Sequence, residues 1–450
     1  MITGEHSREF NRIGVIGMGY VGLTLAAALA QRGFTVYGVD TQPRVLESLA
    51  VGKPHIFEPG IDEVYEHLTG KTLFAGAELP SGGVDVAILC VSTPVQMDTH
   101  TPYLENLRKA AQHVAQRCQP GTLVVVRSTV PVGASRSIVL PELEAAWGRG
   151  NVRLVMAPER TIQGQALREL EELPQVVGGL DQQSLEMGLA FFGKLARQLV
   201  PVSQLETAEL VKLANNCHTD LIYSFGNEIA LLAERWHLDP LEVIRATNLD
   251  YPRHDLAKPG YVGGGCLSKD PYILISAARS VGYEPFLVGQ ARALNEHLPV
   301  HVAEQVVRMI RELRGSTEGA KLAVLGWAYK GWPPTDDMRG TPIADMMPLF
   351  RAAGLEVRGH DYLVSDAVIR QYGGLPMSLE EAFDGADAVL IITNHPGYAK
   401  LELSALLPKL HRPGLIYDSW RILDGKTVGA AGLRYAGLGY VAQPEPELVS

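Results

Sequence analysis

The chain has 450 residues, of which 46% are hydrophobic and 20% are charged, and its formal net charge is −10 at pH 7. This length and composition predict a globular protein of two or three domains. The acidic balance argues against nucleic acid as a partner, because nucleic-acid-binding proteins favour a basic face. No apolar run reaches the length of a membrane span, and no signal peptide is recognisable. We therefore expect a cytoplasmic protein without a membrane partner.

The cysteine pattern argues against two kinds of site. The four cysteines are widely spaced and form no C-x-x-C motif: Cys90, Cys118, Cys217 and Cys266. We expect neither a metal site nor a disulfide framework, and a reducing compartment fits best.

The first part of the chain alternates predicted strands and helices. A strand over 12–17 leads into an Ala- and Leu-rich helix over 23–31, which Gly33 ends. The elements that follow are a helix over 104–117 and strands over 34–39, 84–91, 122–127 and 152–157. Such alternation favours a parallel, doubly wound sheet.

The pattern then becomes helical. An apolar-periodic stretch over 207–236 contains no proline and predicts one long helix. Asp239 is a helix cap, and Pro240 is well placed at the first helical position. After a Gly- and Pro-rich stretch, two more helices are expected, over 270–281 and 290–313.

The end of the chain returns to alternating elements: a helix over 343–353 and strands over 321–326, 355–359, 388–393 and 415–417. The predicted fold class is α/β, with two Rossmann-like doubly wound domains joined by a central helical domain that contains a long helix. The expected domains are 1–200, 201–315 and 316–450.

A dinucleotide-binding fingerprint opens the chain. Gly17, Gly19 and Gly22 form G-x-G-x-x-G between a strand and a helix, and Asp40 ends the next strand. The first glycine permits a tight turn, the second lets backbone approach a pyrophosphate, and the third lets the helix pack on the strand. Asp40 would bind the adenosine ribose and repel a 2′-phosphate, which favours NAD over NADP. Arg44 is the counter-argument, since it could hold that phosphate. Alternatively, the glycines only shape a turn.

Two polar side chains share one face of the long helix. Lys212 and Asn216 are four residues apart, so they project from the same side. Both can bind substrate oxygens, and a buried Lys can also carry a proton. A solvated Lys beside a packing Asn is the plainer alternative.

One thiol stands between glycines and charged residues. Three glycines at 263–265 precede Cys266, and Lys269 and Asp270 follow it. Glycines let backbone come close to a ligand, and a nearby ammonium favours the nucleophilic thiolate. The plainer alternative is a buried cysteine beside a turn.

Six motifs in one order make the chain resemble a known family. They are Gly17–Gly22 with Asp40, Ser128–Gly133, Ala157–Arg160, Lys212–Asn216, Gly263–Asp270 and Gly326–Lys330. This series, over roughly residues 12–440, resembles the UDP-glucose/GDP-mannose dehydrogenase family, the nucleotide-sugar 6-dehydrogenases. The resemblance implies an NAD-binding first domain, a central domain that also serves dimerisation, and a UDP-sugar-binding third domain.

The resemblance also implies that a C6 alcohol is oxidised twice, with two NAD⁺, to a uronic acid. Cys266 would attack the C6 aldehyde, and the thiohemiacetal would lose a second hydride to give a thioester that water hydrolyses. Lys212 would stabilise the oxyanion or relay the proton. The other implied catalytic residues position water and substrate or line the reaction centre: Asn216, Asp270, Glu159 and Thr129.

Binding residues follow from the same resemblance. Those expected at the cofactor are Gly17, Gly19, Tyr20, Val21, Gly22, Asp40, Arg44, Thr93, Thr129 and Lys269. Those expected at the UDP-sugar are Glu159, Arg160, Lys212, Asn216, Arg253, Gly263, Gly264, Tyr329, Lys330 and Arg339. Arg339, in a D-x-R pattern with Asp337, is a candidate for the diphosphate or uracil. Arg253 resembles an Arg that often reaches the sugar of a neighbouring subunit, so a homodimer or higher homo-oligomer is expected. Each could instead form a surface ion pair.

Features of two branches of the family are mixed in this chain. Lys269 resembles the UDP-glucose and GDP-mannose branches. The segments Ala157–Arg160, Pro259–Gly264 and Asp270–Tyr272 resemble the UDP-N-acetylhexosamine branch, although Gln163 stands where that branch usually has Pro. We therefore expect a UDP-N-acetylhexosamine 6-dehydrogenase acting on the GlcNAc or ManNAc sugar, with UDP-glucose as the alternative substrate.

Two other functions stay open. The β-hydroxyacid dehydrogenases also have an N-terminal Rossmann domain and a Lys-x-x-Asn-Asn helix, but they need no thiol and lack a third α/β domain. A non-catalytic regulator that responds to NAD or a nucleotide sugar is the other alternative. Intact Cys266, Lys212 and Asn216 argue against it.

Overall fold

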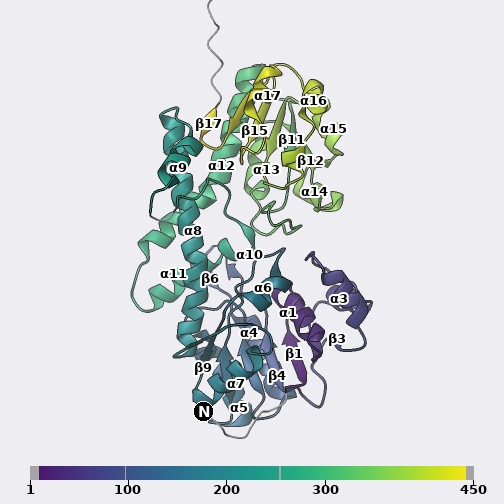
Figure 1. Ribbon diagram of the computed structural model, residues 1–450, viewed down its shortest axis with the longest axis vertical. Coiled ribbons are helices and arrows are strands. Elements are labelled where there is room, and N and C mark those ends of the chain that lie inside the picture. The colour runs from purple at the N-terminus through teal and green to yellow at the C-terminus, as the bar shows by residue number, and fades with distance from the viewer. Residues whose placement is uncertain (1–9, 97, 253–254, 442–450) are drawn as a thin grey trace, which may run out of the picture. The chain divides into compact units, whose positions relative to one another are not determined.

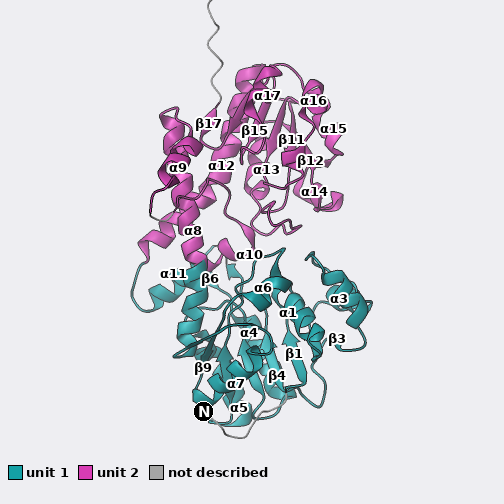
Figure 2. Cartoon of the chain, viewed as in Figure 1, with its two compact units in different colours: residues 1–215, 272–284 teal, residues 216–271, 285–450 magenta. Residues whose placement is uncertain are grey.

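The computed structural model describes residues 10–96, 98–252 and 255–441. The chain divides into two compact units (Figure 2): unit 1 comprises residues 1–215 and 272–284, and unit 2 comprises 216–271 and 285–450. Among the described residues, no helix combines the length and apolar character that a membrane crossing requires.

Unit 1 is built on an eight-stranded sheet in the order β10-β9-β8-β7-β4-β1-β2-β3. Figure 1 labels β1, β3, β4 and β9 of this sheet. The strands from β3 to β8 in this order run parallel, as in dinucleotide-binding Rossmann folds, and β9 is antiparallel to β8. The strands are β1 (Arg12–Ile16), β2 (Thr35–Val39), β3 (Leu73–Gly76), β4 (Val86–Leu89), β7 (Leu123–Val126), β8 (Arg153–Met156), β9 (Gln175–Gly179) and β10 (Leu199–Val202).

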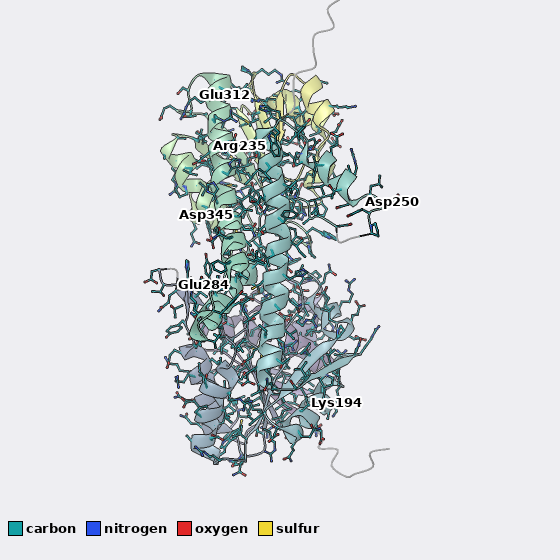
Figure 3. All side chains as sticks on the ribbon, turned by 90° about the vertical axis from the view of Figure 1, so that its left-hand side faces the viewer. Lys194, Arg235, Asp250, Glu284, Glu312 and Asp345 are labelled. Carbon is teal, nitrogen blue, oxygen red and sulfur yellow. The ribbon has the colours of Figure 1, made fainter. Side chains whose placement is uncertain are left out.

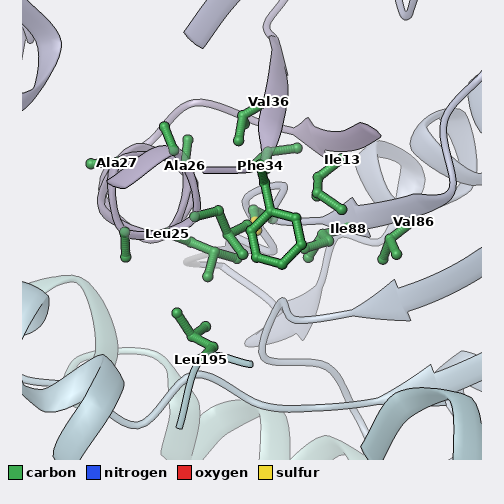
Figure 4. Close-up of a cluster of buried hydrophobic side chains, with 14 of the residues drawn as sticks. Ile13, Leu25, Ala26, Ala27, Phe34, Val36, Val86, Ile88 and Leu195 are labelled. Atoms are coloured by element: carbon green, nitrogen blue, oxygen red, sulfur yellow. The ribbon is translucent and has the colours of Figure 1, made fainter. Parts of the chain in front are cut away.

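Helices flank this sheet and bury its apolar side chains. They are α1 (Tyr20–Gln31), α2 (Pro43–Ala50), α3 (Ile61–Leu68), α4 (Glu105–Arg117), α5 (Leu140–Trp147), α6 (Ala166–Glu172) and α7 (Gln182–Phe192). Figure 4 shows Leu25 of α1 and Phe34 beside Ile88 of β4 in the buried cluster. Each fully buried side chain of this size stabilises the fold by about 1.5–3 kcal/mol. The predicted helix over 23–31 starts earlier, at Tyr20, because the glycine turn leads directly into its first turn.

Unit 2 contains a second sheet, in the order β13-β12-β11-β14-β15-β16-β17. Its strands run parallel, except that β17 is antiparallel to β16. They are β11 (Lys321–Leu325), β12 (Glu356–His360), β13 (Leu375–Pro376), β14 (Ala388–Ile391), β15 (Leu415–Asp418), β16 (Arg434–Gly437) and β17 (Tyr440–Val441). The order from β13 to β16 repeats that from β3 to β8 in unit 1, so the predicted pair of Rossmann-like domains is confirmed.

The middle of the chain is helical, as predicted. Helix α8 (Leu205–Arg235) starts in unit 1 and ends in unit 2, and Figure 3 labels its last residue, Arg235. It is followed by α9 (Pro240–Asn248), α10 (Gly264–Leu267), α11 (Asp270–Ser280) and α12 (Phe286–Arg314). Asp239 caps α9, as expected, by accepting a hydrogen bond of 2.9 Å from the backbone N–H of Leu241.

The two Rossmann-like domains differ after their first strand. In both, a carboxylate at the end of the second strand accepts a hydrogen bond from the turn: Asp40 from the N–H of Met18 at 2.9 Å, and Asp361 from the N–H of Trp327 at 2.6 Å. In unit 1, α1 then begins at once. In unit 2, a loop over 326–342 precedes α13 (Ile343–Ala352). Only the first domain therefore presents a helix N-terminus directly after the turn, which is the feature that binds a pyrophosphate.

Candidate active site

The structure gives a different reason for glycine at each of the three fingerprint positions. Gly17 has a φ of 95°, and a Cβ there would lie 2.7 Å from the carbonyl oxygen of Cys90. A Cβ on Gly22 would lie 1.9 Å from the carbonyl oxygen of Gly17. A Cβ on Gly19 would meet no described atom within 4 Å, and no side chain caps α1 there. The packing of the chain thus requires the outer glycines, whereas the middle one leaves open the space above an uncapped helix N-terminus. That cradle fits a pyrophosphate.

Asp40 is fixed beside this turn. One carboxylate oxygen accepts from Met18 and the other accepts from the N–H of Gln42 at 2.9 Å, while the carboxyl group stays partly exposed. Arg44 is exposed. His55, which the sequence did not single out, lies close enough to feel both charges: burial and Arg44 lower the pKa of His55, and Asp40 opposes them. His55 therefore favours its neutral imidazole form near Asp40.

A buried carboxylate, that of Glu58, connects the start of α1 to a loop after β8. Glu58 is 2% exposed and accepts hydrogen bonds of 2.7 Å from the backbone N–H groups of Gly164 and Ala166. It also accepts a hydrogen bond from the hydroxyl of Tyr20. Burial, reinforced by this hydrogen bond, raises the pKa of Tyr20, so the phenol stays protonated. Sequence reasoning missed Glu58, because its backbone partners, Gly164 and Ala166, follow it by more than 100 positions.

The reaction-centre candidates of unit 1 form a buried ion pair. The Lys212 ammonium lies 3.8 Å from a carboxylate oxygen of Glu159, and their side chains are 7% and 10% exposed. The other oxygen of Glu159 accepts a hydrogen bond from the N–H of Thr161. The guanidinium of Arg160 instead donates to the carbonyl of Pro174 at 3.3 Å. The structure thus brings Glu159 and Lys212 together, and directs Arg160 elsewhere.

The loop after β7 carries Thr129 and is fixed at two points. The hydroxyl of Thr93, which is 3% exposed, donates to the carbonyl of Thr129 at 2.6 Å. Glu209 of α8 accepts from the N–H groups of Gly133 and Ser135, the latter at 2.8 Å. The two predicted threonines therefore lie together, on a loop tied to the helix that carries Lys212.

In unit 2, the glycines around Cys266 permit close contact with the loop over 326–342. Gly264 has a φ of 89°, and its Cβ would lie 2.7 Å from the ring of Tyr329. A Cβ on Gly265 would lie 2.5 Å from the guanidinium carbon of Arg339. Cys266 is exposed, whereas the other three cysteines are buried. The accessible thiol thus directly follows two glycines that pack against an aromatic ring and a cation of this loop.

Asp337 and Asp270 each bind a cationic side chain near this segment, Arg339 and Lys269 respectively. Asp337 binds the guanidinium of Arg339 through both oxygens, at 2.7 Å to Nη2 and 3.0 Å to Nε, which raises the pKa of Arg339. Asp270 is fully buried and accepts from Lys269 at 2.6 Å and from the amide of Asn216 at 2.5 Å. The ammonium of Lys330 lies 5.5 Å from the ring centre of Tyr329.

The predicted site residues fall into two groups, one in each unit. Unit 1 holds the cofactor turn, Asp40, Arg44, both threonines, Glu159, Arg160 and Lys212. Unit 2 holds Asn216, Gly263, Gly264, Cys266, Lys269, Asp270, Tyr329, Lys330 and Arg339. Arg253 lies outside the described residues. Lys212 and Asn216, one helical turn apart on α8, belong to different units.

Profiles of one family match the chain along most of its length. The UDP-glucose/GDP-mannose dehydrogenase family, NAD binding domain, matches residues 11–196; the central domain of this family matches 206–297; and its UDP binding domain matches 323–425.

Individual relatives agree with these profiles. The chain is 32% identical over 424 residues to a UDP-N-acetyl-D-mannosamine dehydrogenase of Pyrococcus horikoshii, covering 93% of this chain and 97% of the relative. The solved structure of a UDP-D-ManNAc dehydrogenase from the same organism has a TM-score of 0.84 at 30% identity, covering 95% and 99% of the two chains. A UDP-glucose dehydrogenase structure from Pyrobaculum islandicum has a TM-score of 0.83 at 28% identity, covering 97% and 100%. The chain therefore belongs to the UDP-glucose/GDP-mannose dehydrogenase family and is an oxidoreductase with NAD as its cofactor.

Proposed function

We propose that this protein oxidises the C6 hydroxyl of a UDP-N-acetylhexosamine, either the GlcNAc or the ManNAc sugar, to the uronic acid in an NAD-dependent four-electron reaction. The observation that carries the proposal is the exposed Cys266 thiol, which interacts electrostatically with Tyr329 and Arg339. The Pyrococcus relative, a UDP-N-acetyl-D-mannosamine dehydrogenase, supports the hexosamine. UDP-glucose is the alternative substrate, favoured by the Pyrobaculum structure and by Lys269.

The thiol explains how one site performs both oxidations. NAD, when bound, accepts one hydride from C6 in each of them. Cys266 adds to the C6 aldehyde, and its proton passes to the carbonyl oxygen as the C–S bond forms, which restores an sp³ carbon that carries a hydride. Loss of that hydride and of the hydroxyl proton leaves a thioester. Water adds to the thioester, the C–S bond breaks, and the carboxylate and the thiol are released.

The buried ion pair of unit 1, Lys212 and Glu159, stabilises negative charge on oxygen and accepts a proton during the reaction. An ammonium such as that of Lys212, already desolvated, stabilises an oxyanion better than a solvated one. Glu159, 3.8 Å from it, accepts a proton from the hydrolytic water. In unit 2, both oxygens of Asp270 are engaged by Lys269 and Asn216. We therefore assign Asp270 to positioning Asn216, whose amide contacts water and substrate.

The UDP-sugar is bound by the loop after β11. Arg339 faces the diphosphate or the uracil, with Asp337 fixing its guanidinium plane through two oxygens. Tyr329 and Lys330 stand on the same loop. In this proposal, residues 1–200 bind NAD, residues 201–315 carry the catalytic Lys and Cys, and residues 316–450 bind the nucleotide.

A panel of nucleotide sugars tests the proposal. NADH formation is followed with UDP-GlcNAc, UDP-ManNAc, UDP-GalNAc, UDP-glucose and GDP-mannose, with the uronic acid identified by mass spectrometry. We expect two NADH per sugar with a UDP-N-acetylhexosamine. Cys266→Ala should form no uronic acid, whereas the control Cys118→Ala, which changes a buried thiol of unit 1, should keep activity. Uronic acid formed by Cys266→Ala at the normal rate contradicts the mechanism.

The alternatives predict different stoichiometry. A β-hydroxyacid dehydrogenase would form one NADH per substrate, and a regulator would bind a nucleotide sugar without turnover. The second Rossmann-like domain and the UDP binding profile over 323–425 favour the nucleotide-sugar reaction over the first of these.

We also propose that the protein works as a homodimer or higher homo-oligomer. Helix α8 carries large exposed apolar side chains at positions that share one face, namely Ile222 (39% exposed), Phe225 (51%) and Leu232 (42%), and Trp236 (66%) directly follows the helix. An apolar stripe of this kind on a helix surface is normally covered by a partner, and a second copy of the chain is the simplest occupant. Light scattering after gel filtration should give at least twice the chain mass. Phe225→Glu should shift the measured mass toward that of the monomer.

The cysteines form no disulfide in the described part of the chain, which fits the cytosol as compartment.

A further inference from the structure

A buried polar network in unit 2 joins α8 and α12 to the segment that precedes Cys266. Arg292 of α12 and Asp220 of α8 are 2% and 1% exposed, and their side chains form an ion pair of 2.8 Å. Asn295 donates to the carboxylate of Asp220 at 2.9 Å and to its carbonyl at 3.0 Å. The carboxylate of Asp220 is thereby held in one orientation, and it fixes the guanidinium plane of Arg292 in turn.

The same guanidinium binds the backbone on both sides of the thiol. Arg292 donates through Nη1 to the carbonyl of Leu267 at 2.8 Å, and through Nη2 to the carbonyl of Val262 at 3.2 Å. Leu267 directly follows Cys266, and Val262 precedes the three glycines. The short helix α10 therefore has a charged donor on the carbonyl at its end and on the carbonyl of the residue that leads into it.

A second side chain fixes the start of the same segment. Asn227 of α8 donates to the carbonyl of Gly260 at 3.0 Å and accepts from its N–H at 2.8 Å, as a neighbouring strand would. The amide of Asn227 also donates to Asn295 at 2.9 Å, so the network is continuous from Gly260 to Leu267. A Cβ on Gly260 would lie 2.4 Å from the ring of Trp420, so this segment packs closely against Trp420 and has no space for a side chain at position 260.

These contacts have a structural reading and a functional one. Buried carbonyls of an irregular segment need donors, and any donor would satisfy that need. Burying an ion pair, however, costs desolvation free energy, and a fold with apolar residues of similar volume in its place is often equally stable. What the planar, two-armed guanidinium adds is a fixed distance between two carbonyls that flank the thiol. Fixed geometry matters most at a reacting atom, where a displacement of about 1 Å can lower a rate roughly 100-fold.

We propose that Arg292, oriented by Asp220, is a positioning residue for Cys266, required for the thiol to reach the C6 aldehyde. The inference rests on the proposed role of Cys266 as the nucleophile. It predicts a selective defect: the first oxidation, which needs no thiol, persists, whereas the second oxidation slows.

Arg292→Lys tests this, because lysine keeps the charge but offers a single point donor that cannot span both carbonyls. Asp220→Asn, which removes the negative charge that orients the guanidinium, is the second variant if the first does not fold. The matched control is Arg308→Lys, at an exposed ion pair with Glu312 on the same helix. Each protein is given one equivalent of UDP-sugar with excess NAD, in the presence of hydroxylamine to trap aldehyde. The alkylation rate of Cys266 by iodoacetamide is measured in parallel by peptide mass spectrometry.

The expected result is a second oxidation slowed about 10- to 100-fold in Arg292→Lys, with trapped aldehyde, an unchanged rate for the first NADH and an altered alkylation rate of Cys266. The control should release two NADH per sugar without aldehyde. Equal slowing of both oxidations, or wild-type kinetics together with a wild-type alkylation rate, would overturn the positioning role. Failure of the proposed function would be seen in other proteins. The unmodified protein would not form two NADH per sugar, or Cys266→Ala would still form uronic acid. In that case the alkylation rate decides whether Arg292 positions the thiol.

Discussion

Gly19→Ala separates the folding role of the fingerprint from its binding role. Gly19 has φ −69° and ψ −168°, a conformation open to alanine, and the added Cβ would meet no described atom within 4 Å. Alanine restricts the unfolded chain, which stabilises by about 0.4–1 kcal/mol. A loss of similar size, about 0.5–1 kcal/mol, accompanies alanine at a helix N-cap. The net change in unfolding free energy should therefore stay within about 1 kcal/mol.

The effect on NAD should be much larger. The new methyl group occupies the space above the first N–H groups of α1, so one charge-assisted hydrogen bond to the pyrophosphate, worth about 1.5–3 kcal/mol, is lost. Binding should weaken roughly 10- to 100-fold.

Calorimetry can measure both quantities, as the midpoint of thermal unfolding and as the dissociation constant for NAD. Gly22→Ala is the matched comparison, because its Cβ would lie 1.9 Å from the carbonyl of Gly17. That overlap should destabilise the fold by about 1–3 kcal/mol or more. Gly19→Ala binding NAD like the unmodified protein, or unfolding as early as Gly22→Ala, would refute the division of roles.

Three further predictions concern stability. Glu58→Ala leaves the N–H groups of Gly164 and Ala166 and the hydroxyl of Tyr20 without their acceptor. Each buried group that stays unpaired lowers the free energy of unfolding by about 1–3 kcal/mol, so the melting temperature should fall by several degrees. The control Glu63→Ala, at an exposed position, should not change the melting temperature. Equal melting temperatures of the two variants would contradict the role of Glu58. Gly264→Ala should destabilise unit 2 by at least about 1 kcal/mol, because alanine disfavours a φ of 89° and its Cβ would lie 2.7 Å from the ring of Tyr329; a chemical denaturation curve like that of the unmodified protein would disprove this. His113 accepts a hydrogen bond of 3.1 Å from the N–H of Leu79, and burial followed by the charge of Arg117 lowers the pKa of His113. Since the unfolded chain takes up this proton near pH 6.5 and the folded chain only at lower pH, the stabilisation present above about pH 6.5 is lost as pH falls through the folded value. His113→Gln, which keeps an acceptor, should flatten the dependence of melting temperature on pH in this range, and parallel curves would show that another group is responsible.

Local pattern was enough to predict several parts of this protein. The glycine turn, the long helix α8 and the cap at Asp239 each depend on residues within a few positions of one another. Between residues 41 and 83 the pattern was weaker, and α2, α3 and β3 were not foreseen. Strand β3 is short and only partly buried, so its apolar signal is diluted by polar neighbours.

The order of motifs along the chain also indicated the family, and with it NAD. Individual contacts in the site could not be predicted in this way. The hydrogen bond from Gly164 to Glu58 joins residues 106 positions apart, and the pair of Arg292 and Asp220 spans 72. Neither spacing has a recurring signature, since it is the sheet order and the crossing of helices that bring such residues together.

The sequence by itself determined which chemical groups this protein has: a dinucleotide turn, a lysine and an asparagine one helical turn apart, and one thiol among glycines. Those assignments need only the chain's local geometry, which a few neighbouring residues dictate. Only the tertiary structure decided that Cys266 is the exposed thiol, that Lys212 meets Glu159, and that Asp270 has both oxygens occupied. Burial and pairing depend on what distant segments place around a side chain, so they appear only when the chain has folded.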